Sequence, residues 1–446
     1  MEKTICAIST PIGVGGISII RMSGEKSLEI LRKVLKKTDF SPVPRKMYFE
    51  NLCGENFSDQ VLVVYFPSPN SYTGEDMVEI HCHGGIYITN AILDSLLKNG
   101  ASLAENGEFS KRAYINGKMT LDSLEGVIDM INAESEEQAK SAYKLMKGDL
   151  SKKVSTFQDT LTDILAELEV SLDYPEMDIE YTTIDKFLQK TENLKNEIST
   201  IKNTSSTGMM IKNGINVAIL GAPNVGKSSL MNVLLGYERA IVTNLEGTTR
   251  DTICESYIFK GIKVNLIDTA GIRESDNEVE QIGIKLSKEK IDTSDLILFV
   301  VDSTRKLSPD EREILDSIKN KKVILVINKT DKEKVETFED FAFPKIEISS
   351  LLGKNIEELK QKIYDEIIGN NISNNSTIIT NTRHKIALEN AENSLKDAIN
   401  TLKNTENLEL FSIDLQNAYS YLGEITGTTS KENIIDRIFS KFCLGK

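Results

Sequence analysis

A phosphate-binding loop is the first stretch of the sequence whose residue types and spacing indicate chemistry. Residues 221–228 read Gly-Ala-Pro-Asn-Val-Gly-Lys-Ser, directly after an apolar run and before an apolar helix start. Glycines in such a loop let backbone N–H groups turn toward phosphate oxygens, and the following helix adds its positive end. Lys227 suits the β and γ phosphates, and the Ser228 hydroxyl suits Mg²⁺. The loop therefore predicts a nucleoside triphosphate site.

Two further motifs would complete the phosphate end of this site. Asp-Thr-Ala-Gly at 268–271 closes a second apolar run. There Asp268 would bind the magnesium shell, and the N–H of Gly271 would meet the γ-phosphate. Gly-Thr-Thr-Arg-Asp at 247–251 lies between the two motifs, and its Thr249 is the natural second hydroxyl ligand for Mg²⁺.

The base is predicted from the motif Asn-Lys-Thr-Asp at 328–331, which follows a third apolar run. An ionised Asp331 only accepts hydrogen bonds, so it suits two adjacent donors of guanine and finds no match on adenine. Ser349 and Ser350 form a weaker candidate for the last base-contacting loop, because the commoner Ser-Ala pair is absent there. The four motifs together predict that the nucleotide is GTP.

Hydrolysis needs another explanation than the usual one. Ile272 follows the second motif, where many GTPases carry a glutamine that orients the attacking water, and isoleucine cannot do this. Asn224 is a candidate ligand for a monovalent cation beside the phosphates. Three downstream glutamates are candidates for positioning the water, although each alone is as well explained by a charged, solvated loop: Glu274, Glu278 and Glu280.

The motifs lie in a stretch whose short apolar runs alternate with helical patterns. Unbroken apolar runs are typical of parallel strands covered on both faces, and this alternation predicts a doubly wound α/β domain. The runs expected to be strands are Asn216–Leu220, Val264–Ile267, Leu296–Val301 and Val323–Ile327. An Asn/Ser-rich stretch, Asn370–Asn375, reads as a linker after this domain.

The segments on either side of that domain have different residue patterns. Residues 1–118 mix short strand-like runs with turns, for example at 17–20 and 61–66. Apolar residues then recur at helical spacing from Phe157 to Leu172, before Asp173-Tyr174-Pro175 breaks the pattern. Helical spacing returns over 388–402 and 408–422. The simplest interpretation is one all-α domain with the nucleotide domain inserted into it; two separate helical caps remain an alternative.

Composition limits the class of protein. A chain of 446 residues suggests about three domains. Its five scattered cysteines include no CxxC pair, which argues against a disulfide framework or a zinc ribbon. The net charge of −14 argues against coating of nucleic acid by a general positive field, although a local basic groove stays open. No secretory signal or membrane-length apolar run is visible, so a cytoplasmic protein without a membrane contact is expected.

The whole chain resembles the MnmE (TrmE) family of bacterial tRNA-modifying GTPases, within the TrmE-Era-EngA-like P-loop superfamily. The resemblance includes the order of domains and several motifs: Gly-Thr-Thr-Arg-Asp at 247–251, Gly-Ile-Arg-Glu at 271–274, Glu-Gln-Ile-Gly at 280–283, Tyr-Thr-Gly-Glu-Asp at 72–76, His-Gly-Gly at 83–85 and Cys-Leu-Gly-Lys at 443–446. It implies a multidomain α+β and α/β protein with an N-terminal folate-binding-like dimerisation domain at 1–118. It also implies helical segments at 119–212 and 373–446, and an inserted Ras-like GTPase domain at 213–372.

In this family the G domains dimerise and K⁺ takes the place of an arginine finger. The resemblance implies K⁺ ligands at Asn224, Thr243, Leu245 and Thr248, and catalytic roles for Lys227 and Glu280, the latter through a bridging water. Mg²⁺ would be held by Ser228 and Thr249. The implied GTP-binding residues are Asn224, Val225, Gly226, Lys227, Ser228, Ser229, Thr243, Asn244, Leu245, Glu246, Gly247, Thr248, Thr249, Asp268, Thr269, Ala270, Gly271, Asn328, Lys329, Asp331, Ser349 and Ser350.

The resemblance also implies partners and a second ligand. The family works as a homodimer with an FAD-dependent partner, MnmG, in a heterotetramer. Together they add a (carboxymethyl)aminomethyl group to C5 of the wobble uridine of certain tRNAs. The carbon comes from 5-formyl- or methylene-tetrahydrofolate, and the matching positions that would line its site are Arg21, Glu79, Lys118 and Lys446.

Several residues keep two interpretations. Arg21 and Glu79 read from the residues alone as a donor–carboxylate pair for a pteridine or as surface charges. His81 and His83 share one strand face by alternation, but without a third ligand a structural role is favoured over a metal. Cys443 is either a thiol with a chemical role in a tail that folds toward the active centre, or a packed or solvent-facing thiol.

Two other functions compete with tRNA modification. A ribosome-assembly GTPase that docks on rRNA would carry the same nucleotide domain, but it normally appends a basic RNA-binding domain, and the flanks show no concentrated Lys/Arg tract. A GTPase with purely structural helical arms is the third possibility, and the folate-domain resemblance argues against it.

Overall fold

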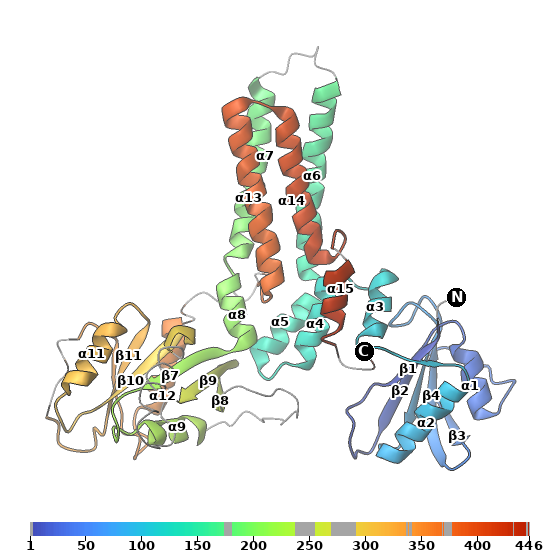
Figure 1. Cartoon of the computed structure of the whole chain (residues 1–446), viewed down its shortest axis with the longest axis horizontal. Helices are drawn as coiled ribbons and strands as arrows, with labels where there is room; N and C mark the ends of the chain where they lie inside the picture. Colours follow the sequence, from blue (N-terminus) through green and yellow to red (C-terminus); the bar gives the residue numbers. More distant parts are fainter. Residues whose placement is uncertain are drawn as a thin grey trace, which may run out of the picture. The chain divides into compact units, whose positions relative to one another are not determined.

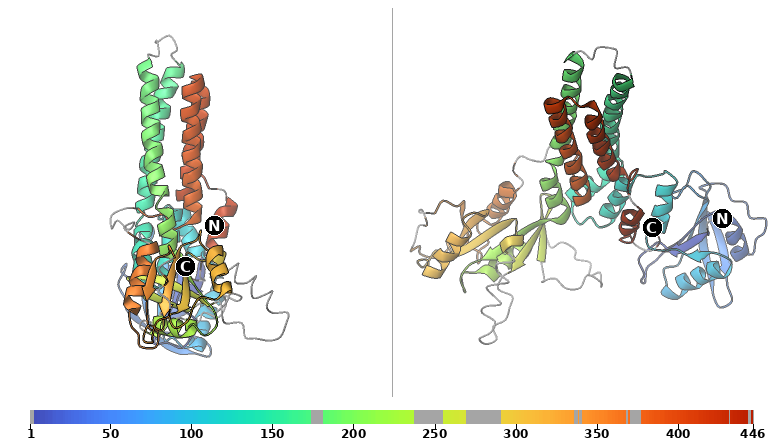
Figure 2. Two further views of the ribbon diagram at one scale, coloured as in Figure 1. Left: turned by 90° about the vertical axis from the view of Figure 1, so that its left-hand side faces the viewer. Right: turned by 45° about the horizontal axis from the view of Figure 1, so that its top comes forward.

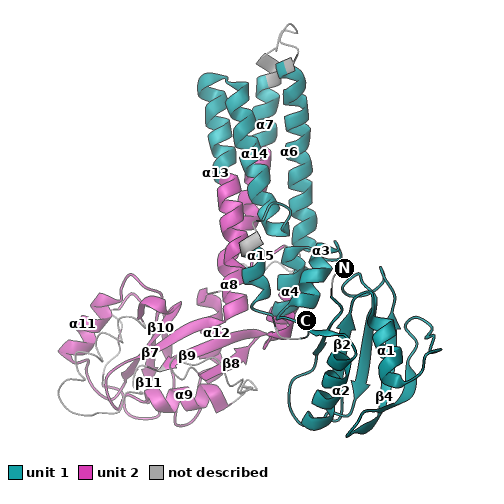
Figure 3. Ribbon diagram, turned by 45° about the vertical axis from the view of Figure 1, so that its right-hand side comes forward, with its two compact units in different colours: residues 1–128, 144–192, 393–446 teal, residues 129–143, 193–392 magenta. Residues whose placement is uncertain are grey.

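The computed structural model describes residues 3–173, 181–236, 255–268, 291–335, 338, 341–367, 369, 377–430, 432–442 and 445. The chain divides into two compact units (Figure 3). Unit 1 takes in residues 1–128, 144–192 and 393–446, and unit 2 takes in residues 129–143 and 193–392. Among the described residues, each unit contains one six-stranded sheet and several helices.

The sheet of unit 1 has the strand order β3-β4-β5-β2-β1-β6 (Figure 1). All its neighbours pair antiparallel except β1 and β6, which are parallel. The strands are β1 (Ile5–Ile8), β2 (Ser18–Ser23), β3 (Tyr48–Cys53), β4 (Ser58–Phe66), β5 (Met77–Cys82) and β6 (Ser102–Leu103). The runs at 17–20 and 61–66 thus fall in β2 and β4, as their β-branched residues predict.

Burial alternates along β2, β3 and β5, because α1 (Ser27–Leu35) and α2 (Ile86–Lys98) cover one whole face of the sheet, whereas on the other face a small core at Ile5 and Ala7 of β1 packs against Phe109 of α3 (Glu108–Ile115). On the face covered by α1 and α2, Ile20, Leu52 and Ile80 are buried in a core with these two helices. The residues one step along each strand point to the opposite face, which is polar around Arg21 and Glu79 and more exposed toward β3. This second face is where chemistry-bearing side chains collect.

The remaining helices of unit 1 follow the predicted helical pattern. Those within the unit are α3 (Glu108–Ile115), α6 (Asp149–Asp173), α14 (Leu408–Thr426) and α15 (Glu432–Phe439). The division between the units falls inside α4 (Leu121–Ile131), α5 (Glu136–Met146), α7 (Tyr181–Lys202) and α13 (Thr382–Thr405). α6 ends at Asp173, the first residue of the predicted break.

The long helices of unit 1 lie side by side, as Figure 2 shows. The ring of Phe187 in α7 packs on that of Phe411 in α14, with centroids 6.1 Å apart. α14 begins where the Asn407 side chain accepts from the N–H of Leu410, and it ends at Gly427, whose φ of 97° closes the last turn. Segments from before and after the doubly wound sheet therefore share one apolar core.

The C-terminal part of unit 1 returns to the N-terminal sheet. Phe439 and Phe442 are buried with Leu121 and Leu124 of α4 in one cluster. The Cβ of any residue other than glycine at position 107 would lie 2.6 Å from the carbonyl oxygen of Phe439, so α3 and α15 approach each other closely there. This packing leads the chain toward Gly445.

The sheet of unit 2 has the order β12-β11-β10-β7-β9-β8 and is parallel except for β8, which pairs antiparallel with β9. Its strands are β7 (Ile215–Leu220), β8 (Glu255–Phe259), β9 (Ile262–Asp268), β10 (Leu296–Asp302), β11 (Val323–Asn328) and β12 (Lys345–Glu347). Its other helices are α8 (Ser205–Asn213), α9 (Lys227–Gly236), α11 (Pro309–Ser317) and α12 (Ile356–Ile367). The four predicted strands are confirmed as β7, β9, β10 and β11.

Both faces of this sheet are covered, which explains its unbroken apolar runs. Every residue of β10 is buried. Leu298 and Val300 face a core with α9 and α12, whereas Phe299 and Val301 face a second core with the end of α11. α11 itself starts with a capping box between Ser308 and Glu311 and with Pro309 in its first turn.

The fold class is the predicted one: an N-terminal α/β domain, an all-α helical domain and a doubly wound P-loop domain. The predicted residue boundaries of these domains stay a prediction. The linker expected at Asn370–Asn375 lies outside the described residues.

Candidate functional site

The predicted nucleotide residues lie at the carboxyl edge of the parallel sheet in unit 2. The loop 221–226 follows β7, Asp302 ends β10, and Asn328 ends β11. Parallel strands place all their carboxyl ends at one edge, and ligands of doubly wound sheets bind there. β9 also ends at this edge, with Asp268 as its last residue.

Close packing shapes the phosphate-binding loop. At Gly226, which has φ +101°, a Cβ would lie 2.3 Å from the side-chain nitrogen of Asn328. At Gly221, which has φ +148°, a Cβ would lie 2.3 Å from the carbonyl oxygen of Val300. Only glycine fits both positions, so the loop motif depends on its neighbours in the sheet as well as on its own turn.

The loop runs directly into α9, whose first residue is Lys227. The ammonium group of Lys227 donates to the carbonyl oxygens of Gly221 and Ala222, at 2.8 Å each. Ser228 and Ser229 in the first turn of α9 are exposed. The Lys227 side chain thus folds back onto the loop. The two exposed hydroxyls lie at a helix N-terminus, where the helix dipole favours anions.

Asn328 ties the phosphate loop to the base-contacting loop. Its side-chain N–H donates to the carbonyl oxygen of Val225 at 2.9 Å. Its side-chain oxygen accepts from the backbone N–H and the hydroxyl of Ser350, at 3.0 and 2.8 Å. Asn328 is 1% exposed, so these hydrogen bonds are shielded from water, and water cannot replace one that is lost. The asparagine acts here as a structural brace between two predicted ligand loops.

Lys329 makes a second brace. Its ammonium group donates to the backbone oxygen of Asn224 at 2.7 Å and to the carboxylate of Asp302 at 2.6 Å. Burial would raise the pKa of Asp302, but hydrogen bonds from Lys329 and Thr304 outweigh it, so its pKa is lowered. Asp302 was not among the predicted site residues. Its position directly after the apolar run 296–301 is the signal that could have identified it.

Asp331 is placed to meet a base. It is exposed, and its carboxylate accepts from the Ser349 hydroxyl at 2.6 Å. That hydrogen bond lowers the pKa of Asp331. The structure therefore brings together Asn224, Val225, Gly226, Lys227, Ser228, Ser229, Asn328, Lys329, Asp331, Ser349 and Ser350 around one edge.

The other predicted nucleotide residues fall outside the described part of the chain. These are Thr243, Asn244, Leu245, Glu246, Gly247, Thr248, Thr249, Thr269, Ala270, Gly271 and Glu280, together with the side chain of Asp268. Lys446 and Cys443 of the C-terminal tail also fall outside it.

A second polar site lies on the N-terminal sheet of unit 1. Arg21 and Glu79 are direct cross-strand partners in β2 and β5. The guanidinium donates through Nε and Nη2 to Glu79 Oε1, at 3.0 and 2.8 Å. The rings of Tyr72 and Phe109 lie 5.5 and 5.8 Å from the Arg21 guanidinium carbon. Two aromatic rings thus lie beside the guanidinium of this charged pair.

The C-terminal tail reaches this site. The carbonyl oxygen of Gly445 accepts from the Ser9 hydroxyl at 3.0 Å and from Arg21 Nη1 at 3.4 Å. Lys118 instead donates to the carbonyl oxygen of Pro69 at 3.0 Å, and its stem packs beside Gly74. Of the predicted folate residues, Arg21 and Glu79 therefore contact each other, while Lys118 holds the neighbouring loop.

The two histidines of this region have different surroundings. His81 lies in β5, with Nε2 3.6 Å from Glu79 Oε2. His83 follows the strand, is exposed, and its Nδ1 lies 2.5 Å from Asp59 Oδ1. The described residues contain no group of three or more His, Cys, Asp and Glu side chains arranged to hold a metal ion.

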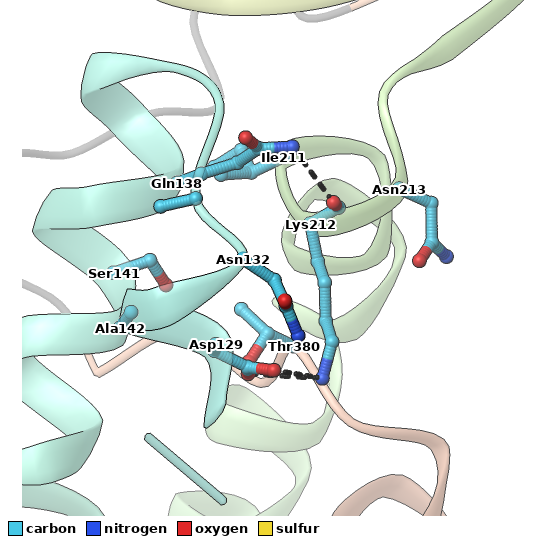
Figure 4. Close-up of a pocket in the computed structure, with 10 residues that line it drawn as sticks. Asp129, Asn132, Gln138, Ser141, Ala142, Ile211, Lys212, Asn213 and Thr380 are labelled. Carbon is cyan, nitrogen blue, oxygen red and sulfur yellow. Dashed lines mark hydrogen bonds and ion pairs between the residues drawn. The ribbon is translucent and has the colours of Figure 1, made fainter. Parts of the chain in front are cut away.

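A small pocket of about 160 Å³ lies elsewhere in unit 2, where the chain enters and leaves the region of the parallel sheet. Figure 4 shows the Lys212 ammonium pointing at Asp129, 2.8 Å away, and the Gln138 amide donating to the backbone oxygen of Lys212. Asn213 and Thr380 also line the pocket. The charged side chains of the pocket are thus paired with each other, which indicates that these contacts have a structural role.

Comparison with known families decides between the possible functions. The family model described as the MnmE helical domain matches residues 121–443, and the model described as the GTP-binding protein TrmE N-terminus matches residues 4–118. The chain belongs to the MnmE family. Two curated relatives in this family agree over their full length. The tRNA modification GTPase MnmE of Clostridioides difficile (strain 630) is 42% identical over 100% of both chains, and that of Alkaliphilus metalliredigens (strain QYMF) is 39% identical over 100% of both.

Among solved structures, the G domain of the T. maritima FeoB iron transporter is 31% identical, with a TM-score of 0.27, and the match covers 34% of this chain and 98% of that one. The MnmE family membership makes the chain a GTP hydrolase of tRNA modification. The family resemblance predicted from the motifs is thereby confirmed, and modification is favoured over the ribosome-assembly alternative. None of the helices that the structure describes is long and apolar enough to cross a membrane.

Proposed function

We propose that this chain is a K⁺-dependent GTPase that hydrolyses GTP to GDP. With an FAD-dependent partner, it drives addition of a (carboxymethyl)aminomethyl group to C5 of the wobble uridine of certain tRNAs. The partner would be a protein of the MnmG kind in a heterotetramer, and the FAD would lie on that partner. The reaction would take place in the cytoplasm.

The arrangement of Asp331 supports guanine as the base. An exposed carboxylate that already accepts one hydrogen bond from Ser349 keeps acceptor positions for the two adjacent N–H donors of guanine. Its lowered pKa keeps it ionised at neutral pH. Asn328, Lys329 and Ser350 would hold the two loops around the base and the phosphates, since they already join those loops.

Magnesium and potassium would bind beside the phosphates. The exposed Ser228 hydroxyl at the start of α9 is an oxygen donor of the kind Mg²⁺ prefers, and Thr249 would be its second protein ligand. Asn224 has φ +63°, and Lys329 holds its backbone oxygen. This fixed, exposed asparagine would bind K⁺ together with Thr243, Leu245 and Thr248. K⁺ would supply the positive charge that other GTPases take from an arginine, while Glu280 orients the water.

The N-terminal site would hold a 5-formyl- or methylene-tetrahydrofolate. The Arg21–Glu79 pair offers charged hydrogen-bonding groups, and the nearby rings of Tyr72 and Phe109 offer flat apolar surfaces, as a pteridine requires. Burial raises the pKa of Tyr72, so that side chain stays neutral. Lys118 and Lys446 would complete the site.

A homodimer is proposed on the same sheet face. Phe49 is 64% exposed there, and its cross-strand partner Leu62 is 38% exposed. Exposed apolar side chains that adjoin one another across strands mark surfaces for association. The tRNA would then meet a dimer with two folate sites.

The observation that carries the proposal is the brace of Asn328 between the phosphate loop and the Ser349–Ser350 loop, in a chain that also carries the Arg21–Glu79 site. The test is mass spectrometry of tRNA nucleosides from cells lacking the gene. Loss of the modified wobble uridine, restored by the wild-type gene but not by Lys227→Ala, is expected. An unchanged nucleoside profile in the deletion strain contradicts the proposal.

A further inference from the structure

Glu79 uses only half of its carboxylate in the contact with Arg21. Both guanidinium hydrogen bonds end on Oε1, at 3.0 and 2.8 Å. Oε2 faces His81 Nε2 across 3.6 Å, which is longer than a hydrogen bond. The carboxylate therefore keeps an acceptor oxygen directed at the imidazole without a hydrogen bond between them.

The imidazole of His81 likewise has a nitrogen without a hydrogen bond. Its Nε2 is buried, and among the described residues it has no hydrogen-bond partner. Buried polar atoms in proteins are nearly always paired, because an unpaired one loses its bonds to water without replacement. A ligand group that bonds to Nε2 and to Glu79 Oε2 together would account for both atoms.

Strand geometry puts His81 inside the proposed site. His81 and Glu79 are two residues apart in β5, so their side chains share the face that carries Arg21. His81 pairs across the sheet with Ile19 in β2 and with Leu62 in β4. His81 thus has an apolar residue beside it in each neighbouring strand, while Glu79, two positions along β5, lies beside Arg21, whose guanidinium is near the rings of Tyr72 and Phe109.

We propose that His81 is a further ligand-binding residue of the N-terminal site. Its Nε2 and the Oε2 of Glu79 together bind one nitrogen-bearing edge of a flat heterocycle. The carboxylate accepts an N–H of that edge, and the imidazole bonds to the neighbouring ring atom in whichever tautomer matches it. The inference rests on the proposed folate function and extends it by naming the residue that reads the edge of the ring.

His83 is a matched control from the same strand end. It is also a histidine, but its ring is 72% exposed and Nδ1 already contacts Asp59. A ligand that binds at Glu79 is therefore not expected to change the environment of the His83 ring.

The first measurement uses the unaltered full-length chain. Its three histidines are His81, His83 and His384, so imidazole ¹⁵N spectra of histidine-labelled protein are simple to assign with single variants. Saturating 5-formyltetrahydrofolate is expected to shift the His81 nitrogens and leave those of His83 in place. Unshifted His81 signals at saturation overturn the proposal.

The second measurement is calorimetric titration of the same folate into variants. His81→Leu keeps the volume but removes the polar atoms, and we expect about tenfold weaker binding. His81→Gln retains an N–H and a carbonyl and is expected to recover most of the affinity. His83→Leu is expected to bind like the wild type. Equal affinity of His81→Leu and wild type, or equal losses in His81→Leu and His83→Leu, overturns the role of His81.

Folate binding by the wild-type protein distinguishes a failure of the proposed folate function from a failure of the proposed role of His81. If the wild type binds no reduced folate, the folate function and the role of His81 both fail. If it binds folate and the two His81 readouts stay unchanged, only the role of His81 fails.

Discussion

At the scale of single residues, the nucleotide site is a set of polar braces between loops. Asn328 and Lys329 reach from the end of β11 to backbone oxygens of Val225 and Asn224 in the phosphate loop. Their hydrogen bonds determine where the loops lie before any ligand contact. Asp331 differs from them, because its carboxylate faces outward beside Ser349.

Asp331→Asn tests the assignment of the base. The amide replaces one acceptor by a donor, so one N–H of guanine loses its partner while the 2-carbonyl of xanthine gains one. We expect GTP binding to weaken roughly 10- to 100-fold and xanthosine triphosphate binding to improve. Fluorescent-nucleotide titration measures both, with the exposed Asp316→Asn as control. Undiminished GTP affinity in Asp331→Asn would place the base elsewhere.

The Asp302–Lys329 pair predicts a pH-dependent stability. The pKa of Asp302 is lowered below its ordinary value of 3.8, so its contribution is complete above that value and is lost as pH falls through the lowered one. We expect Asp302→Asn to lower the free energy of unfolding by about 1–3 kcal/mol at pH 7 and by progressively less in acid. Urea denaturation at several pH values measures this. A difference that stays constant down to the acid limit of folding argues against the pair.

The proposed K⁺ site gives a prediction for Asn224. K⁺ should raise GTP turnover by at least about tenfold over Na⁺, because a bound cation offsets transition-state charge. Asn224→Ala should lose most of this difference while nucleotide binding remains. Steady-state phosphate release in the two salts decides the matter. Equal turnover of the wild type in K⁺ and Na⁺ means that the cation proposal is wrong.

At the scale of elements, the β8–β9 hairpin is attached to the start of α5 within unit 2. The N–H of Glu137 donates to the carbonyl oxygen of Gly261 at 3.1 Å. Lys263 in β9 forms an ion pair with Glu134, just before the helix. β9 runs from this attachment to Asp268 at the nucleotide edge, so one strand spans from the helical segment to a residue predicted to bind the magnesium shell.

A charge exchange tests this attachment. Lys263→Glu places like charges together and should lower the free energy of unfolding by up to about 1 kcal/mol, since the pair is only partly shielded from water. Adding Glu134→Lys should restore most of the loss, as contacting pairs are not additive. Thermal and urea denaturation of the four proteins completes the cycle. Strict additivity would show that the pair does not interact in solution.

At the scale of the whole molecule, dimerisation is expected through the N-terminal sheet. Phe49 is the most exposed apolar residue that is paired across strands in this sheet. Phe49→Asp places a charge there, and burying that charge in an interface would be costly. We expect sedimentation to show a shift from dimer toward monomer at micromolar concentration. Because Phe49 is exposed within a single chain, the fold of each monomer should be kept, and the far-UV circular dichroism of the variant should match that of the wild type. A variant that sediments as the wild type rules out this face as the interface.

The strands and helices of unit 2 were predictable because their signal is local. β10 is buried on both faces, and its seven consecutive buried residues appear in the sequence as an apolar run followed by Asp302. The P-loop at 221–228 and the Asn-Lys-Thr-Asp motif at 328–331 are each local in the same sense, and so is the helical break at Asp173 in unit 1. Residue types at short spacing therefore sufficed to predict the doubly wound fold of the nucleotide domain, its P-loop and guanine as the base, whereas the fold of the N-terminal domain was predicted from the family resemblance.

Tertiary structure alone decided which residues meet. The bond from Asn328 to Val225 joins residues about a hundred positions apart, and Asp302 became a site residue only through its contact with Lys329. Arg21 and Glu79 are either a pair or two surface charges in the sequence, and the β2–β5 register makes them a pair. Burial of His81 Nε2 depends on the strands and loops packed around it. Long-range register and burial arise from the whole chain, so no short stretch of sequence encodes them.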